Sequence, residues 1–186
     1  MEKGDIIEFG RYPQNNSDTK EPIKWLVLAV SGNEALIISQ YGLDCKQLHS
    51  EYVNITWENC DLRKWLNNDF LKEAFTEDEI GMIKPIKLSE LMNDDKDRVF
   101  CLSVEEAKAK EYFDDDKARQ CQPTSLAKKH GVHAEDGYCG WLLRSQRCEP
   151  SVWGVYLDGK VDKWNSYPVN VNDGAVRRGT EIFSVN

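Results

Sequence analysis

In the stretch Tyr138-Cys139-Gly140-Trp141-Leu142-Leu143-Arg144-Ser145, the apolar run that begins at Trp141 predicts a core strand. The composition changes after it, because glycines become frequent and Asp158-Gly159 is a typical hairpin signal. Residues 169–172 alternate valine with asparagine, which is the period of a half-buried strand. Residues 182–185 contain Ile, Phe and Val and predict a final strand. The end of the chain is therefore expected to consist of strands.

The beginning of the chain predicts strands as well. Residues 5–9 indicate a short opening strand, after which Gly10-Arg11-Tyr12-Pro13 is expected to turn the chain. Residues 23–30 are rich in Val, Leu, Ile and Trp and predict a buried strand. Ser31-Gly32-Asn33 is a turn signal, so residues 34–40 are expected to return as the second strand of a hairpin.

The middle of the chain has the pattern of helices. Apolar residues at nearly helical spacing form a stripe over residues 62–75, and Asn59 or Asp61 is the expected N-cap. Thr76-x-x-Glu79 is a capping box that predicts a second, short helix. This helix is expected to stop before Pro85, because the residue before a proline disfavours helical backbone.

Two more helices are expected before the C-terminal strands. Ser103-x-x-Glu106 is another capping box, which predicts a helix to about Tyr112. A short helix is expected from Thr124 or Ser125 to Gly131, where glycine is a typical C-terminal cap. Strands at both ends with helices between them predict the α+β class, with mixed or antiparallel sheets. Because terminal strands often pair with each other, residues 1–186 are expected to form one domain.

Charge and hydropathy restrict the partners. The chain has 186 residues with 24 Lys or Arg and 32 Asp or Glu, and its formal net charge is −8. It has no dense basic patch, so nucleic acid is not expected as a partner. The longest apolar run, Trp25 to Val30, is far shorter than the roughly 20 residues of a membrane-spanning helix. The N-terminus lacks the apolar core of a signal peptide, so the chain as written is expected to be cytoplasmic. Prior removal of an export signal, with display on a surface or virion, stays open.

Cysteine, histidine and glycine patterns do not predict a catalytic or metal site. Six cysteines are present, and without an export signal we expect them to be mostly reduced and partly buried. No Cys-x-x-Cys, nucleophile elbow or phosphate-binding glycine loop occurs. His130-x-x-His133 with Cys139 could hold zinc, but two histidines at this spacing are common by chance. We therefore predict no catalytic residue, no metal and no cofactor.

Residues 147–173 stand out by composition. Their aromatic residues are Trp153, Tyr156, Trp164 and Tyr167, and most of the others are Ser, Asn, Gly, Pro or Val. Tyr and Trp give a large contact area with few rotatable bonds, while the small polar residues give adaptable hydrogen bonding. This mixture is typical of binding loops, whose affinity comes mainly from the aromatic residues. The alternative is a core hairpin in which the aromatic residues are buried.

Motifs along nearly the whole chain resemble those of an uncharacterised group of bacterial domains. That group has a WLRS strand, then an Asn-, Asp- and Gly-rich stretch with DG-x-V, and then GVRP. The corresponding segments are Trp141-Leu142-Leu143-Arg144-Ser145, Asp158-Gly159-Lys160-Val161 and Gly174-Ala175-Val176-Arg177. Four earlier segments also match, which are Phe9-Gly10-Arg11-Tyr12-Pro13-Gln14, Trp25-Leu26-Val27-Leu28, Tyr41-Gly42-Leu43-Asp44-Cys45 and Leu62-Arg63-Lys64-Trp65-Leu66-Asn67. Each motif is weak alone, and their shared order makes the resemblance specific.

Such domains resemble the formylglycine-generating-enzyme type of C-type lectin fold, which variable proteins of diversity-generating retroelements use. In those proteins a reverse transcriptase rewrites adenine positions near the 3′ end of the gene, and the scaffold displays the changed side chains as a ligand-binding surface. The resemblance implies a non-enzymatic binding module, of bacterial or phage origin, for a protein or cell-surface ligand. By position, the displayed side chains would be Arg147, Glu149, Ser151, Trp153, Tyr156, Asp162, Trp164, Ser166, Tyr167, Asn170 and Asn172.

The resemblance also implies which residues are structural. The valines expected to face the core are Val161, Val169, Val171 and Val176. The sequence departs from the group's pattern in two places. Arg178 stands where the group usually has Pro, and Thr180-Glu181 stands where an apolar pair is usual. These departures leave the course of the last strand open.

Two other functions of the same fold are alternatives. Glu149-Pro150-Ser151 and Trp164-Asn165-Ser166 resemble the Glu-Pro-Asn and Trp-Asn-Asp motifs of calcium-dependent sugar-binding lectins. Serine replaces Asn in the first motif and Asp in the second, which removes a carboxylate that calcium favours. The enzyme branch of the fold oxidises a cysteine with paired cysteines and copper, and Cys139 and Cys148 lack the sequence setting of that pair. A calcium lectin and a metal-dependent enzyme thus remain alternatives to the binding module.

Overall fold

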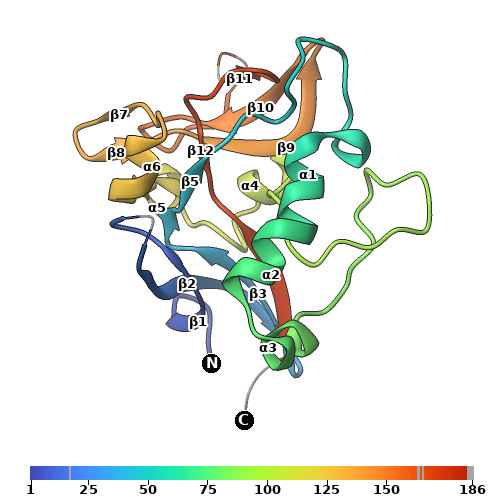
Figure 1. Ribbon diagram of the computed structural model, residues 1–186, viewed down its shortest axis with the longest axis vertical. Helices are drawn as coiled ribbons and strands as arrows, with labels where there is room; N and C mark the ends of the chain where they lie inside the picture. The colour runs from blue at the N-terminus through green and yellow to red at the C-terminus, as the bar shows by residue number, and fades with distance from the viewer. Residues whose placement is uncertain (17, 163, 165, 184–186) are drawn as a thin grey trace.

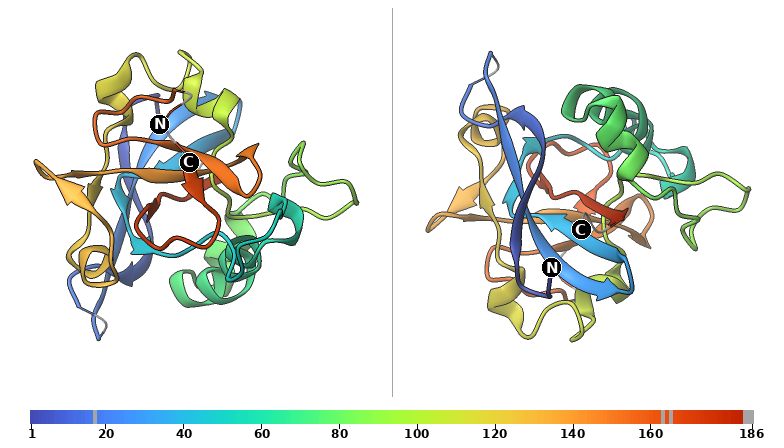
Figure 2. Two further views of the ribbon diagram at one scale, coloured as in Figure 1. Left: turned by 90° about the horizontal axis from the view of Figure 1, so that it is seen from above. Right: turned by 90° about the horizontal axis from the view of Figure 1, so that it is seen from below.

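The computed structural model describes residues 1–16, 18–162, 164 and 166–183, and it shows an α+β fold with mostly antiparallel sheets (Figures 1 and 2). One sheet contains four antiparallel strands in the order β1-β2-β3-β13. Their bounds are Ile6–Pro13 for β1, Lys20–Ser31 for β2, Glu34–Ser39 for β3 and Gly179–Phe183 for β13. β2 and β3 form the expected hairpin, and Gly32, with φ of 60°, lies in its turn.

The first and last strands share this sheet but do not pair. β1 and β13 lie at its opposite edges, with β2 and β3 between them. The expected pairing of the terminal strands is therefore wrong, because β13 forms its ladder with β3 along residues 34–38.

β1 is longer than the sequence predicts. Gly10-Arg11-Tyr12-Pro13 continues the strand instead of turning the chain, with a register shift between Glu8 and Arg11. Gly10 has φ of 69°, and a Cβ there would lie 2.5 Å from the Phe75 ring, so only glycine fits. The local irregularity bends the strand without ending it.

A second sheet carries the late part of the chain. It has five strands in the order β11-β10-β9-β12-β5, in which β12 is parallel to β9 and the other neighbours are antiparallel. The bounds are Asp44–Cys45 for β5, Trp141–Cys148 for β9, Ser151–Val155 for β10, Ser166–Pro168 for β11 and Ala175–Val176 for β12. Two short pairs complete the strands, with bounds Tyr41–Gly42 for β4, Gln122–Pro123 for β6, Ala134–Glu135 for β7 and Tyr138–Cys139 for β8.

The strand expected at residues 169–172 is wrong. Val169 is buried, but its carbonyl oxygen accepts a hydrogen bond from the His49 backbone N at 2.8 Å instead of joining a ladder. The Val171 N donates to the Pro168 carbonyl oxygen at 3.1 Å, which turns the chain. Of the four valines expected in the core, Val169 and Val176 are buried, and Val161 and Val171 are half-buried.

The helices lie in the middle of the chain, as expected. Their bounds are Trp57–Asn59 for η1, Asp61–Trp65 for α1, Leu66–Phe70 for η2, Leu71–Ala74 for α2, Glu77–Met82 for α3, Val104–Lys108 for α4, Asp116–Arg119 for α5 and Ser125–Lys129 for α6. α1, η2 and α2 follow one another without a break, and η2 is a π-helical turn. No helix among the described residues is long and apolar enough to cross a membrane.

The helix ends confirm some predictions and correct others. Both capping boxes are present, at Thr76 and at Ser103, and Thr124 caps α6. The N-cap of α1 is Cys60, whose Sγ accepts a hydrogen bond from the Arg63 N at 3.4 Å, so neither Asn59 nor Asp61 caps it. α4 ends at Lys108 instead of near Tyr112, because the next residue has extended backbone.

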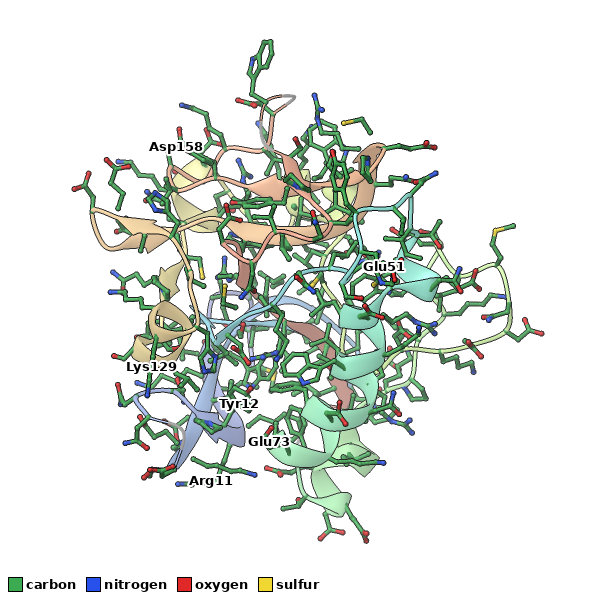
Figure 3. The ribbon with its side chains drawn as sticks, turned by 45° about the horizontal axis from the view of Figure 1, so that its top comes forward. Arg11, Tyr12, Glu51, Glu73, Lys129 and Asp158 are labelled. Atoms are coloured by element: carbon green, nitrogen blue, oxygen red, sulfur yellow. The ribbon has the colours of Figure 1, made fainter. Side chains whose placement is uncertain are left out.

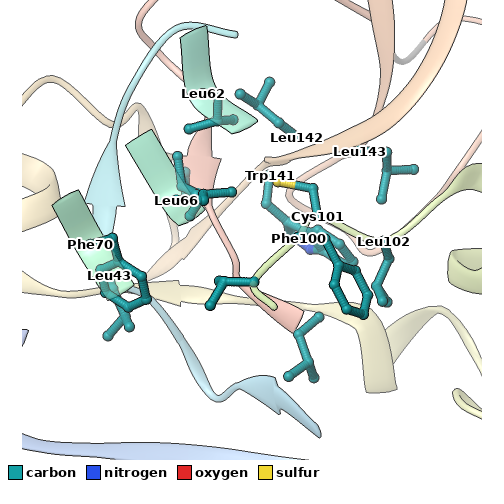
Figure 4. Packing of buried hydrophobic residues seen from close by; sticks show 14 of the residues in the cluster. Leu43, Leu62, Leu66, Phe70, Phe100, Cys101, Leu102, Trp141, Leu142 and Leu143 are labelled. Atoms are coloured by element: carbon teal, nitrogen blue, oxygen red, sulfur yellow. The ribbon is translucent and has the colours of Figure 1, made fainter. Parts of the chain in front are cut away.

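Buried side chains from both sheets and from the helical run 61–74 pack into one cluster. Figure 4 shows part of it, in which Trp141, Leu142 and Leu143 of β9 lie near Phe100 and Leu62. Trp141 is fully buried, and its Nε1 donates to the Arg119 carbonyl oxygen at 3.1 Å. The prediction of a core strand that begins at Trp141 is confirmed.

Arg178 and Thr180, which depart from the resemblance, are both buried. The Arg178 guanidinium lies 3.9 Å from the centre of the Phe70 ring and also faces Tyr12 and Trp65. Its Nη2 lies 3.9 Å from the Asp44 carboxylate. The Thr180 hydroxyl donates to the Arg98 carbonyl oxygen at 2.7 Å. Both polar side chains thus have interactions inside the protein, and β13 begins at Gly179, directly after Arg178.

Candidate binding surface

Residues 147–173 include the end of β9, the strands β10 and β11, and the turns around them. These elements lie at the end of the molecule opposite to the N-terminus (Figure 1). In Figure 3, Asp158 is seen at this end, and Arg11 and Glu73 at the other. β10 pairs with β9 on one side and with β11 on the other, so backbone hydrogen bonds fix the framework from which the turns project.

Two aromatic side chains of the segment are exposed. Trp164 exposes 79% of its surface and Tyr156 exposes 49%. The backbone under each is fixed: Trp164 N donates to the Asp162 carboxylate at 2.8 Å, and Tyr156 N donates to the Lys160 carbonyl oxygen at 3.0 Å. These aromatic rings therefore face solvent from a hydrogen-bonded backbone.

The expected turn at Asp158-Gly159 is present, and it lies in the connection between the paired antiparallel strands β10 and β11. Gly159 N donates to the Tyr156 carbonyl oxygen at 2.9 Å, and Gly159 has φ of 83°. A Cβ on Gly159 would lie 1.7 Å from the Asp116 carbonyl oxygen, so the turn packs directly on the start of α5. This contact holds the backbone beside Tyr156 in place.

Trp153 is half-buried between two cations. The Lys108 ammonium lies 4.7 Å from the centre of its indole, and the Arg147 guanidinium carbon lies 5.4 Å away. Cation–π contacts of this kind stabilise an exposed site by about 0.5–1 kcal/mol. The Trp153 ring is therefore partly covered by two positively charged side chains, and a ligand there would meet these charges as well as the ring.

The structure contradicts the predicted display of Ser151 and Tyr167. Ser151 is buried, and its hydroxyl donates to the Cys148 carbonyl oxygen at 2.9 Å. Tyr167 is half-buried because it lies across three glycines, where a Cβ on Gly140 or Gly154 would approach its atoms to 1.9 or 2.1 Å. Burial raises the pKa of Tyr167. Both residues support the framework, and a ligand at the surface would meet their neighbours.

The charged and small polar residues of the predicted set are accessible to different degrees. Glu149 and Asn170 are exposed, and Arg147, Asp162 and Ser166 are half-buried. These five residues are therefore accessible to solvent at least in part. Lys163 and Asn165, which flank Trp164 in the sequence, lie outside the described residues, so the Asn165 of the lectin-like motif is not described.

Asn172 is exposed, but it lies in a hollow that none of the other predicted binding residues lines. It lines a hollow of about 430 Å³ together with Lys46, Asp61 and Trp65. Its Nδ2 donates to the His130 carbonyl oxygen at 3.2 Å. The sequence therefore groups Asn172 with side chains that the fold separates from it.

A loop that the sequence analysis did not select lies beside the surface. Tyr52 exposes 62% of its surface and Val53 exposes 40%. Gln146 of β9 donates a side-chain hydrogen bond to Asn54, which ties this loop to the strand that leads into Arg147. The only sequence signal was a Tyr and an Asn in a short polar stretch far from residues 147–173.

All six cysteines are free, and five of them are buried. Cys148 is exposed at the end of β9, directly before the turn to β10. The Ser151 hydroxyl lies 3.0 Å from its Sγ, and Arg147 Nη1 donates to the same sulfur at 3.4 Å. The contacts with Ser151 and with the Arg147 guanidinium lower the pKa of this thiol. Partial burial was expected, and five of the six side chains are buried; the reduced state stays a prediction.

The side chains considered for zinc do not converge. His130 Nδ1 lies 2.7 Å from the Asp44 carboxylate, while the Cys139 thiol donates to the Cys121 carbonyl oxygen at 3.4 Å. Within the described part of the chain, no three His, Cys, Asp or Glu side chains are grouped so that they could hold a metal ion.

In the lectin-like Glu-Pro-Ser motif, the Ser151 hydroxyl donates a hydrogen bond to the Cys148 carbonyl oxygen.

Residues 32–177 match a protein family described as a domain of unknown function, DUF6273. The chain belongs to this family. The DUF6273 region contains β9, β10 and β11 and therefore all of the predicted binding residues, while β1, β2 and β13 lie outside it. Comparison with curated proteins and with solved structures gives no match.

Proposed function

We propose that this DUF6273 protein is a non-enzymatic binding module that recognises a protein or cell-surface ligand through the exposed side chains of residues 147–170. The observation that carries the proposal is the exposure of Trp164 and Tyr156 on a backbone fixed by hydrogen bonds. An exposed indole is unfavourable in water, and its burial against a partner is a main source of affinity at protein interfaces.

The charges around these rings would set selectivity. Arg147 and Lys108 flank Trp153, and Glu149 and Asp158 are exposed in neighbouring turns. Complementary charge affects the choice of partner and the rate of association more than the total affinity. The surface is therefore suited to a partner with a mixed polar surface around an apolar centre.

The proposal includes the scaffold and its origin. A C-type lectin-like fold of the formylglycine-generating-enzyme subtype, used as a variable protein of a diversity-generating retroelement, agrees with the order of the sequence motifs. The placement of the late segment on one edge of a sheet, far from the N-terminus, also suits a displayed surface.

Binding can be tested with arrays of glycans and of cell-envelope proteins. A ligand bound by the unmodified protein should bind at least about tenfold more weakly to the double variant Trp164→Ala, Tyr156→Ala. Met92→Ala is the matched control, because Met92 exposes 89% of its surface on a different loop. Equal binding by the double variant, or an equal loss in the control, would contradict the proposed surface.

The origin can be tested in DNA. A near-copy of the 3′ end of the gene that differs only at adenines, next to a reverse-transcriptase gene, is the expected result. The absence of such a copy from the surrounding DNA would contradict the retroelement part of the proposal. The binding test does not depend on this result.

A further inference from the structure

Four arginine side chains are buried among the described residues. Three of them have a carboxylate within 4 Å, and the fourth, Arg177, has none in this part of the chain. Arg144 forms ion pairs with Glu90 and Glu106, Arg119 pairs with Asp116, and Arg178 has Asp44 at 3.9 Å. Arg177 is only 2% exposed and has no carboxylate within ion-pair distance among the described residues. An unpaired buried charge is strongly unfavourable, so its surroundings indicate what neutralises it.

Arg177 is held in a fixed orientation by neutral groups. Its Nε donates to the Ser39 carbonyl oxygen at 2.9 Å, and its Nη1 donates to the Arg119 carbonyl oxygen at 3.1 Å. Its guanidinium carbon lies 5.2 Å from the centre of the Trp141 indole. Since a guanidinium has five N–H donors, the Nη2 end is left without an acceptor in the described part of the chain.

The same side chain lines a pocket of about 280 Å³. Arg177 is the buried member of the lining and therefore forms its floor, while Ile6, Leu26, Tyr41 and Tyr138 contribute apolar and aromatic walls. No Asp or Glu lines it, although the protein as a whole has a net charge of −8. Such a pocket favours a small anion with an apolar body.

A second polar group of the pocket also has no partner. Gln40 lines it, and the Gln40 Oε1 is buried without a hydrogen bond among the described residues. A buried carbonyl oxygen of this kind costs about 1–3 kcal/mol of desolvation unless a donor reaches it. Arg177 and Gln40 thus offer one donor group and one acceptor in the same small space.

We propose that this pocket is a binding site for a small organic carboxylate. The carboxylate would accept hydrogen bonds from Arg177, an adjacent O–H or N–H would donate to Gln40, and an apolar body would lie between Ile6, Leu26 and the two tyrosines. Arginine suits this ligand because its planar guanidinium matches a carboxylate. The site is separate from the surface around Trp164, so its test does not depend on the proposed function.

A neighbouring thiol is the competing counter-charge. Cys121 and Cys139 pair across a backbone bridge beside Gly42. The contact with Cys139 and the charge of Arg177 lower the pKa of Cys121. If Cys121 were a thiolate at neutral pH, it would neutralise Arg177 without a ligand. Ultraviolet thiolate absorbance that is lost in Cys121→Ser would establish this and would overturn the proposal.

The direct test is calorimetric titration of the full chain with benzoate, with its neutral analogue benzamide, and with inorganic phosphate. We expect benzoate to bind with a dissociation constant of about 1 mM and benzamide and phosphate to bind at least about tenfold more weakly. Equal binding of benzamide would remove the role of charge, and equal binding of phosphate would contradict the carboxylate assignment.

Variants at an exposed residue of the pocket lining separate an effect on binding from an effect on folding. Arg177→Gln should abolish benzoate binding, but it also removes hydrogen bonds that hold the chain. Ile6 is 47% exposed, so Ile6→Glu and Ile6→Lys should fold alike, and only Ile6→Glu should weaken benzoate binding, by about tenfold. Val30→Glu, at an exposed residue of β2 outside the pocket, is the matched control. Equal binding by the two Ile6 variants would overturn the site.

Discussion

The central strand of the second sheet and the turn before its edge strand β11 place tryptophan in opposite surroundings. Trp141, at the start of β9, is fully buried, and its indole N–H donates to the Arg119 carbonyl oxygen. Trp164, in the turn before β11, is 79% exposed, and its backbone N donates to the Asp162 carboxylate. The difference shows that aromatic content alone does not distinguish core from surface. What separates the two is whether the ring has neighbours on every side.

The largest test of this comparison is Trp141→Ala. Loss of a fully buried indole should lower the free energy of unfolding by about 3–5 kcal/mol, because it removes apolar burial and leaves a cavity. Urea unfolding followed by circular dichroism measures the change. A loss of less than about 1 kcal/mol would mean that β9 is not part of the core.

The contact between Tyr167 and the glycines should give the next effect. A Cβ on Gly154 would lie 2.1 Å from the Tyr167 ring, so Gly154→Ala should destabilise the protein by about 1–3 kcal/mol. Tyr167→Ala should destabilise by a similar amount, and the double variant should lose less than the sum of both, because removal of the ring makes room for the methyl group. Additive losses in urea unfolding would contradict a direct contact and would return Tyr167 to the displayed surface.

Acidification should weaken the part of the protein around Asp44. Burial alone would raise the pKa of this carboxyl, but the Arg178 guanidinium and the hydrogen bonds from His130 and Tyr12 hold it below 3.8. As the pH falls, the Asp44 carboxylate of the unfolded chain is protonated before that of the folded chain. The contribution of Asp44 to the free energy of unfolding is therefore complete above pH 3.8, and it is lost as the pH falls through the lower pKa of the folded state.

Asp44→Asn tests that dependence. The variant should be less stable at neutral pH by about 1–2 kcal/mol, and its free energy of unfolding should fall less steeply below about pH 4. Asp69→Asn, at an exposed position of η2, is the control and should keep the dependence of the unmodified protein. The same slope in Asp44→Asn as in the control would show that other carboxyl groups account for acid unfolding.

The sequence predicts local features better than distant contacts. The capping boxes at Thr76 and Ser103 and the turn at Gly32 depend on neighbouring residues, and each was found as expected. The course of Gly10-Arg11-Tyr12-Pro13 depends on the ring of Phe75, which no local pattern shows. For the same reason, residues 169–172 alternate like a strand, although the carbonyl of Val169 pairs with His49.

The proposed binding surface shows the same limit. Composition marked residues 147–173 as unusual, but it could not separate Trp164 and Tyr156 from Tyr167, which lies on glycines from three separate segments. Tyr52 and Val53 come from a loop that is joined to the surface through the hydrogen bond between Asn54 and Gln146. Side chains brought together by tertiary contacts leave no spacing in the sequence.

The smallest effect on stability should come from the two exposed rings. Because Trp164 and Tyr156 expose 79% and 49% of their surfaces, their truncation removes little buried area, and the double variant Trp164→Ala, Tyr156→Ala should unfold within about 0.5 kcal/mol of the unmodified protein. Thermal unfolding and circular dichroism check this directly. A loss close to that of Trp141→Ala would place both rings in the core and would contradict the proposed binding surface. An unchanged stability together with weakened ligand binding would instead separate recognition from folding, which is the property that a displayed surface requires.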